Sequence, residues 1–314
     1  MNSEENEQGP VRHRSADRIL ISGSTGFIGR ALIGQLTASG YTVVPLLRGR
    51  SSHGYPHWNP GSGTLDPALV SGFDTVIHLA GEPVFGHWTD AKKCRILESR
   101  LQGTDELATA LAAAEVPPRV FLCASGINFY GNQGDTILGE DAPVGQGFLA
   151  KVCEAWEGAS QPLANVARIV KLRIGVVLSP YGGMLSKILP IFRFGLGGVV
   201  AGGHGYMSWI SLRDLVRAVE YLVNADQLAG PINIVSPQAV TARKFSEAVA
   251  AAVGRSALIS VPGWPVRLLL GEMAEDTILG SVRAFPQKLL DAGFEFHDTD
   301  LELAVATFKL RKSI

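Results

Sequence analysis

The sequence predicts an α/β protein with a doubly wound parallel sheet and a smaller C-terminal α+β lobe. From residue 18 onward, short apolar runs alternate with helical patterns, as in chains that place helices on both faces of a parallel sheet. The first run, a glycine-rich turn, a helical pattern and the second run form a βαβ unit of about thirty residues. The alternation breaks down after residue 230. These observations predict a Rossmann-type sheet followed by a second lobe.

The expected elements follow in order along the chain. Buried strands are predicted at 18–22, 41–47, 74–80, 120–124, 169–178 and 232–235, because each is a nearly continuous apolar run. Helical spacing of apolar residues appears at 27–39, 97–111, 148–156 and from residue 212. We therefore expect a Rossmann domain over residues 18–180. Residues 181–314 should form mainly the substrate side of the site and the C-terminal lobe, with segments that can interleave with the Rossmann sheet.

Composition excludes several classes of partner. The 314 residues carry a formal net charge of -1, so no overall field favours nucleic acid or an anionic membrane, and a small molecule is the expected partner. No apolar run reaches the roughly 18 residues of a membrane span. The three cysteines lack a C-x-x-C pair or histidine cluster, which predicts buried thiols in a reducing compartment and no metal site. Residues 1–17 are polar and lack an apolar signal core, so we expect a disordered tail on a cytoplasmic protein.

A glycine-rich turn joins the first predicted strand to the first predicted helix. Its spacing is G-x-x-G-x-x-G, and such glycines permit a tight turn, close approach of backbone N–H groups to a pyrophosphate, and close helix–sheet packing. The alternative is an ordinary glycine-rich turn, but the position directly after the first strand favours a dinucleotide site. The predicted cofactor-binding residues here are Gly23, Ser24, Thr25, Gly26, Phe27, Ile28 and Gly29.

The ends of the next two predicted strands indicate which dinucleotide is bound. NAD-selective sites place an acidic residue on the ribose 2′-hydroxyl at the end of the second strand, whereas this chain has Leu47 and Arg48 there. Arginine suits a 2′-phosphate, so NADP is the predicted cofactor, although Arg48 on an ordinary surface loop is the alternative. After the third strand, residues that leave room for a cofactor are expected to line it: Leu79, Ala80, Gly81 and Glu82.

Several motifs together carry a family resemblance. GSTGFIG, DTVIHLAGE, SRLQGT, SGINFYG, RIGVVL and WISLRDL occur in this order, and over residues 18–235 the chain resembles the extended short-chain dehydrogenases/reductases of the NAD-dependent epimerase/dehydratase superfamily. AGE, ESR, GLGG and GFEF more narrowly resemble an atypical branch called epimerase family proteins, which carries a C-terminal tail of unknown function. The resemblance implies NADP contacts from Leu47, Arg48, Leu79, Ala80 and Arg100, the last in place of an asparagine usual in extended enzymes.

The resemblance also implies a catalytic Tyr-x-x-x-Lys pair, which this chain lacks. In that pair the lysine and the nicotinamide lower the pKa of the tyrosine, whose hydroxyl then exchanges a proton with the substrate. None of the six tyrosines has a lysine four positions later. Alignment on Lys151 puts Gly147 at the tyrosine position, and alignment on Phe148 puts Val152 at the lysine position. Either way the phenol is absent.

Other residues are candidates for the substrate side of the site. Ser125 and Tyr130, in the loop after the fourth strand, are the nearest candidates for catalysis, although we favour a structural role in the cofactor loop. The acidic residues Asp135, Glu140 and Asp141 are expected to be exposed carboxylates of a solvated loop. The candidate cleft residues are Asn128, Phe148, His204 and Trp209, with core packing of the tryptophan and turn capping by the histidine as the alternatives for the last two.

Three hypotheses of function follow. The leading one is an NADP-dependent oxidoreductase or epimerase-like enzyme that acts on a small polar metabolite with altered acid–base chemistry. The second is a non-catalytic NADP(H)-binding or sensing protein, and the third a nucleotide-sugar epimerase with relocated acid–base residues, which the fold permits but does not demand. By analogy with related folds we also expect a homodimer.

Overall fold

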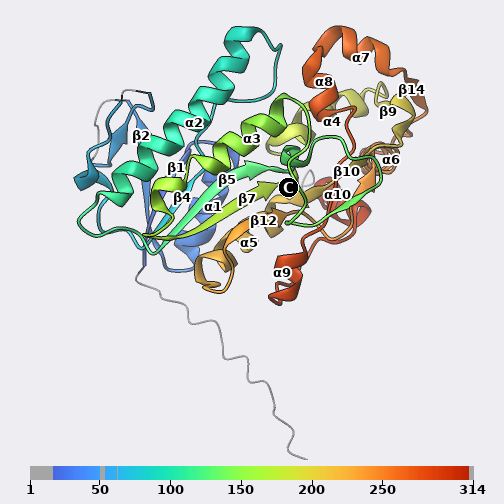
Figure 1. Ribbon diagram of the computed structural model, residues 1–314. Coiled ribbons are helices and arrows are strands. Elements are labelled where there is room, and N and C mark those ends of the chain that lie inside the picture. Colours follow the sequence, from blue (N-terminus) through green and yellow to red (C-terminus); the bar gives the residue numbers. More distant parts are fainter. Residues whose placement is uncertain (1–16, 50–53, 62, 311–314) are drawn as a thin grey trace, which may run out of the picture.

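The computed structural model describes residues 17–49, 54–61 and 63–310. The tail predicted for residues 1–17 lies, except for Asp17, outside these residues. A seven-stranded parallel sheet forms the centre of the molecule, in the order β12-β7-β5-β4-β1-β2-β3 (Figure 1). Its strands are β1 (Arg18–Ser22), β2 (Thr42–Arg48), β3 (His57–Trp58), β4 (Thr75–His78), β5 (Val120–Gly126), β7 (Arg168–Ile174) and β12 (Gly230–Ile234).

The strand order reverses between β1 and β4. From β1 the chain builds outward through β2 and β3, and from β4 it builds in the opposite direction through β5, β7 and β12. In open sheets of this kind, ligands bind outside the carboxyl ends of the strands at this switch point. The predicted doubly wound sheet is confirmed, and its switch point lies beside the glycine-rich turn that follows β1.

Helices cover both faces of the sheet, which explains why its strands are apolar throughout. On one face, Ile19 and Ile21 of β1 pack in a core with α1 (Phe27–Ala38) and α5 (Leu212–Asn224). On the other, Leu20 packs in a core with α2 (Asp90–Ala112) and α3 (Phe148–Gly158) (Figure 1). Alternate residues of one strand therefore serve two separate cores.

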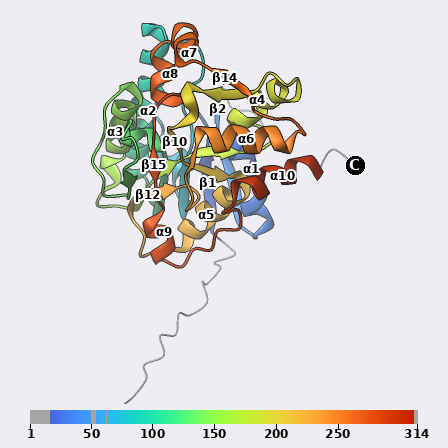
Figure 2. The ribbon, with the colours of Figure 1, turned by 90° about the vertical axis from the view of Figure 1, so that its right-hand side faces the viewer.

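Short elements beyond the sheet form the second lobe, which lies at the right in Figure 1 and faces the viewer in Figure 2. Its core joins α4 (Gly183–Arg193), α6 (Ala242–Ala252) and α10 (Leu301–Leu310) around Trp209. Its described strands pair in twos. Three pairs are parallel: β8 (Val176–Leu178) with β11 (Trp209–Ser211), β9 (Gly198–Val200) with β14 (Ile259–Val261), and β6 (Ile137–Leu138) with β15 (Arg283–Ala284). The fourth pair, β10 (Tyr206–Met207) with β13 (Val240–Thr241), is antiparallel. Because α5 and β12 return to the large sheet, the chain after residue 180 is shared between the sheet and this lobe.

The remaining bounds are as follows. They are η1 (Pro67–Val70), η2 (Ile127–Tyr130), η3 (Gln161–Leu163), η4 (Ala201–Gly203), α7 (Gly263–Leu270), α8 (Glu272–Thr277) and α9 (Gln287–Asp291).

A buried histidine ties three elements together beneath the glycine-rich turn. His78, at the end of β4, has Nδ1 2.6 Å from Ser22 Oγ of β1 and Nε2 3.0 Å from Thr104 Oγ1 of α2. A neutral imidazole offers one donor and one acceptor, which suits two hydroxyl partners. Burial, with a smaller contribution from the Arg100 charge, lowers the pKa of His78 to about 3.

The neutral state of His78 predicts a pH dependence of stability. Its folded-state pKa of about 3 lies below the unfolded value of about 6.5, so the unfolded chain takes up the proton first. The stabilisation that comes from neutral His78 is complete above about pH 6.5. By about pH 5 the free energy of unfolding should have fallen by about 2 kcal/mol. We expect urea unfolding from pH 8 to pH 5 to show this slope in the wild type and a shallower one in H78Q, with the exposed-site control H87Q unchanged. Equal slopes in H78Q and wild type would contradict the assignment.

Candidate functional site

The glycine-rich turn lies directly against the chain that leaves β4. Gly23 has a φ of +71°, and a Cβ built there would lie 2.8 Å from the carbonyl carbon of Leu79 and 2.9 Å from the nitrogen of Ala80. At Gly29 a Cβ would lie 2.3 Å from the carbonyl oxygen of Gly23. Both positions therefore require glycine. Gly23 requires it because of its positive φ and its close contacts, and Gly29 because of its close contacts alone.

The turn also leaves the start of α1 suited to an anion. Gly26 is the N-cap residue and supplies no side-chain hydrogen bond to the first helical amides. Uncapped N–H groups at a helix N-terminus attract negative charge through their direction and through the helix dipole. Of the remaining turn residues, Ser24 is buried, Thr25 is exposed, and Phe27 and Ile28 are half-buried. The cradle fits a pyrophosphate.

The segment after β4 forms the opposite wall of this cradle. The Leu79 amide donates to the Ser22 carbonyl at 3.2 Å, and the Ala80 amide approaches Ser22 Oγ at 3.4 Å. A Cβ at Gly81 would lie 3.1 Å from Cζ of Arg100. The structure thus brings together three parts of the chain that are well separated in sequence. They are the glycine-rich turn, the predicted segment after β4 and Arg100.

Arg100 is a buried cation at the edge of the cradle. It is 9% exposed, and its Nη1 donates to the carbonyls of Glu82 and Ile96, each at 3.0 Å. Its Cζ lies 4.7 Å from the ring centroid of Trp156, and burial lowers its pKa. Within the part of the chain that the structure describes, no carboxylate lies within ion-pair distance of this guanidinium. Such a cation suits an anionic ligand.

A pocket of about 270 Å³ opens beside the end of β2. Arg48 is exposed at that strand end, and Leu47 is half-buried behind it. The carboxylate of Glu82 accepts a hydrogen bond from Lys92 at 2.7 Å and lies 3.8 Å from Arg95. The hydrogen bond from Lys92 has the largest effect on the pKa of Glu82 and holds it below the usual range. The lining residues are Arg48, Asn59, Pro60, Gly61, Glu82, Arg95, Glu98, Ser99 and Gln102.

At the end of β5 the two predicted catalytic hydroxyls belong to a buried network. Ser125 Oγ donates to Glu157 at 2.8 Å, and Arg173 holds the same carboxylate through two hydrogen bonds of 2.8 and 3.0 Å. Tyr130 OH donates to Asn233 at 2.7 Å and accepts from Arg173 at 3.0 Å, while burial raises its pKa. A raised pKa opposes the proton transfer expected of a catalytic phenol, so these contacts favour the structural role for both hydroxyls.

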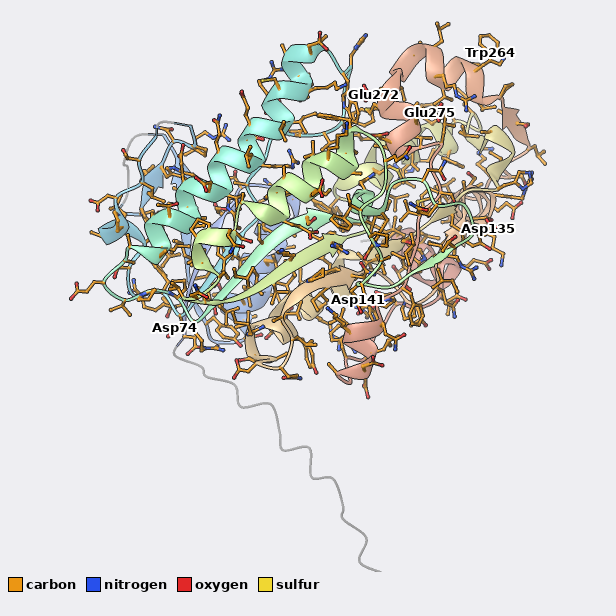
Figure 3. All side chains as sticks on the ribbon, in the orientation of Figure 1. Asp74, Asp135, Asp141, Trp264, Glu272 and Glu275 are labelled. Carbon is orange, nitrogen blue, oxygen red and sulfur yellow. The ribbon has the colours of Figure 1, made fainter. Side chains whose placement is uncertain are left out.

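Glu157 and Arg173 were not predicted as site residues from the sequence, although Arg173 begins the motif RIGVVL. Charged side chains are ordinarily exposed, and no motif pairs a helix glutamate with an arginine on the following strand. Their burial, with side chains 7% and 4% exposed, appears only in the fold. The same holds for Glu140, which was expected to be exposed but is buried and accepts the Asn233 amide at 3.1 Å. Asp135 and Asp141 do lie at the surface (Figure 3).

The start of α3 carries an aromatic cluster where the phenol is missing. The ring of Phe148 packs edge-on against Trp88, with centroids 5.0 Å apart, and Lys93 Nζ lies 4.9 Å from its centroid. Asn128 Nδ2 donates to the main-chain oxygen of Asp276 at 2.7 Å. Phe148 and Asn128 are half-buried at this end of the sheet.

The two remaining cleft candidates lie in different environments. His204 is exposed in the loop after η4. Trp209 is fully buried in the core of the second lobe, and its Nε1 donates to the carbonyl of Gln238 at 2.9 Å. This placement favours core packing for Trp209, and it leaves His204 free to meet a ligand.

Of the three cysteines expected to be buried, Cys123 and Cys153 are buried, but Cys94 is exposed. The described residues, 17–49, 54–61 and 63–310, contain no cluster of histidine, cysteine, aspartate or glutamate that could hold a metal ion. None of the helices in these ranges is both long and apolar enough to cross a membrane.

Comparisons with known proteins agree with the geometry. Residues 19–235 match the model of the NAD dependent epimerase/dehydratase family, and residues 261–308 match a domain of unknown function, DUF1731. An epimerase family protein of Mycobacterium bovis is 40% identical over 282 residues, which cover 89% of this chain and 93% of the relative. The human epimerase family protein SDR39U1 is 31% identical over 297 residues, 92% of this chain and 98% of the relative.

Solved structures show the same fold. The crystal structure of human SDR39U1 (isoform 2) with NADPH superposes with a TM-score of 0.84 at 29% identity, covering 95% of this chain and all of the other. UDP-N-acetylglucosamine 4-epimerase of Bacillus cereus, at 18% identity and a TM-score of 0.72 over 95% of this chain and 99% of the other, shares the fold. With its family model matching over most of its length, this chain belongs to the NAD dependent epimerase/dehydratase family.

Proposed function

We propose that this protein binds NADP(H) and acts as an oxidoreductase or epimerase-like enzyme on a small polar metabolite. The observation that carries the proposal is the contact of the glycine turn with Leu79 and Ala80, which builds a pyrophosphate cradle at the switch point of the sheet. The crystal structure of human SDR39U1 contains NADPH, which supports the choice of cofactor.

Each part of the site has a distinct role in this proposal. The turn, residues 23–29, holds the pyrophosphate with its backbone amides, and residues 79–82 form the wall beside it. Arg48 and the facing Arg95 provide positive charge for a 2′-phosphate in the pocket beside β2. Arg100 adds a buried positive charge at the edge of the cradle. When bound, the nicotinamide supplies or accepts a hydride.

A second function is favoured by the chemistry of the nicotinamide end. Phe148 cannot transfer a proton, and the hydroxyls of Ser125 and Tyr130 are held in the buried network around Arg173. A non-catalytic NADP(H)-binding or sensing protein would have such a site, with an intact cofactor cradle but no phenol at the start of α3. The two functions differ in one measurable property, which is turnover. Cytoplasmic location and a homodimer stay predictions from the sequence.

The cofactor preference can be measured by isothermal titration calorimetry. We expect wild-type protein to bind NADPH more tightly than NADH. R48S should weaken NADPH binding about 10- to 100-fold, because a charge-assisted hydrogen bond contributes about 1.5–3 kcal/mol, and should leave NADH binding unchanged. K244S, which removes an exposed charge on α6, is the matched control. NADH binding as tight as NADPH binding in the wild type would overturn the assignment.

Turnover separates the enzyme from the sensor. We expect NADPH oxidation, followed by absorbance at about 340 nm, with at least one member of a panel of small polar aldehydes and ketones. UDP-sugars are included, because interconversion of a UDP-sugar would instead identify a nucleotide-sugar epimerase. Tight NADPH binding with no conversion of any compound would favour the non-catalytic function.

A further inference from the structure

A carboxylate from the second lobe fills the side-chain space at the start of α3. Asp276, on α8, is half-buried, and its Oδ2 accepts the Leu149 amide at 2.8 Å. A Cβ built at Gly147 would lie 2.8 Å from Oδ1 and 3.1 Å from Oδ2 of this carboxylate. Gly147 is the tyrosine position when the chain is aligned on Lys151. The carboxylate therefore lies where the missing side chain would begin.

Contacts from the cofactor side of the molecule place α8 over this end of the sheet. Asn128 donates to the Asp276 carbonyl at 2.7 Å, and its Oδ1 lies 3.5 Å from a Cβ built at Gly126, the last residue of β5. The Gly86 amide, in the loop after β4, approaches Met273 Sδ at 3.4 Å. The Asn128 side chain thus links α8 to the carboxyl end of β5. Ligands bind outside the carboxyl ends of the strands in such sheets.

The charges around Asp276 come from three elements. Glu272 lies on α8 itself and is paired at 2.6 Å with Lys93 of α2 (Figure 3 labels Glu272 and Glu275 on α8). The amides at the start of α3 favour the ionised carboxylate, and so does Lys93, whereas burial and Glu272 oppose it. Burial has the largest effect and raises the pKa of Asp276 above its ordinary value. A carboxyl group whose pKa is raised moves toward the pH range in which it can both donate and accept a proton.

We propose that Asp276 is the general acid–base of this site and replaces the tyrosine that α3 lacks. The inference rests on the proposed NADP(H)-dependent function. In the reductive direction, a hydride from NADPH adds to the carbonyl carbon of the substrate and the C=O π pair moves to oxygen. That oxygen takes the proton of the Asp276 carboxyl. An alcohol, NADP⁺ and the Asp276 carboxylate result, and the carboxylate regains a proton from water.

The competing explanation is that Asp276 only caps α3. The N-cap residue Gly147 has no side chain, and the helix has no cap of its own. Substitution by asparagine separates the two roles, because an amide oxygen still accepts the Leu149 N–H but the side chain no longer carries a proton. Substitution by alanine removes both the accepting oxygen and the proton. Glu275, an exposed neighbour that is paired with Arg267 of α7, provides the matched control E275Q.

The experiment compares wild type, D276N, D276A and E275Q for NADPH affinity, melting temperature and kcat/KM with any carbonyl that the panel identifies. For D276N we expect kcat/KM to fall about 10²- to 10⁴-fold and its pH profile to lose one limb. NADPH affinity and melting temperature should stay near wild type. E275Q should behave as wild type, and D276A should lose both activity and thermal stability. Wild-type turnover in D276N would show that Asp276 is only a cap.

A titration decides the proposal if the panel yields no substrate. With ¹³C-labelled aspartate, the Asp276 carboxyl is the resonance missing in D276N, and its shift is followed with pH in the presence of NADPH. We expect a midpoint above that of an ordinary aspartate, because burial raises the pKa of Asp276. An ordinary or lowered midpoint would overturn the proposal. Failure of the wild type to bind NADPH would instead refute the proposed function, so the two failures are distinguishable.

Discussion

The site depends on the absence of side chains at Gly23 and Gly29. A Cβ at Gly29 would lie 2.3 Å from the Gly23 carbonyl oxygen, and one at Gly23 would meet the backbone of residues 79 and 80. Only with both positions open can the turn after β1 lie on the end of β4 while the N-terminus of α1 points outward. The cradle is therefore a property of backbone contact, and the side chains around it supply charge and selectivity.

The two ends of the candidate site are built from different parts of the molecule. The large sheet provides the cradle, the pocket at Arg48 and the buried cation Arg100. At the opposite end, the Arg173–Glu157 pair joins β7 to α3, and Asp276 joins α8 of the second lobe to α3. Because removing two charges from water costs about as much as their attraction returns, such a buried ion pair need not add net stability. Its contacts with Ser125 and Tyr130 favour a structural role for both hydroxyls.

The sequence predicted the parts whose physics is local. Strands covered on both faces are continuous apolar runs, so the strands that build the sheet core were predictable, as was the turn between β1 and α1. The two-residue strand β3, His57–Trp58, was missed because it lies in a glycine- and proline-rich stretch without a period. The partners of Glu157 and Asp276 could not be predicted, because tertiary packing alone brings residue 173 to 157 and residue 276 to 149. The exposure expected for Glu140 was wrong for the same reason: the packing of β12 buries it.

Close backbone contact at Gly29 shapes the cofactor cradle. Calorimetric titration of NADPH into G29A measures this dependence, with G34A as the control, because a Cβ at Gly34 on the same helix meets nothing within 4 Å. We predict that G29A stays folded by circular dichroism and binds NADPH about 100-fold more weakly or not at all, whereas G34A binds as the wild type does. Wild-type NADPH affinity in folded G29A would contradict the account.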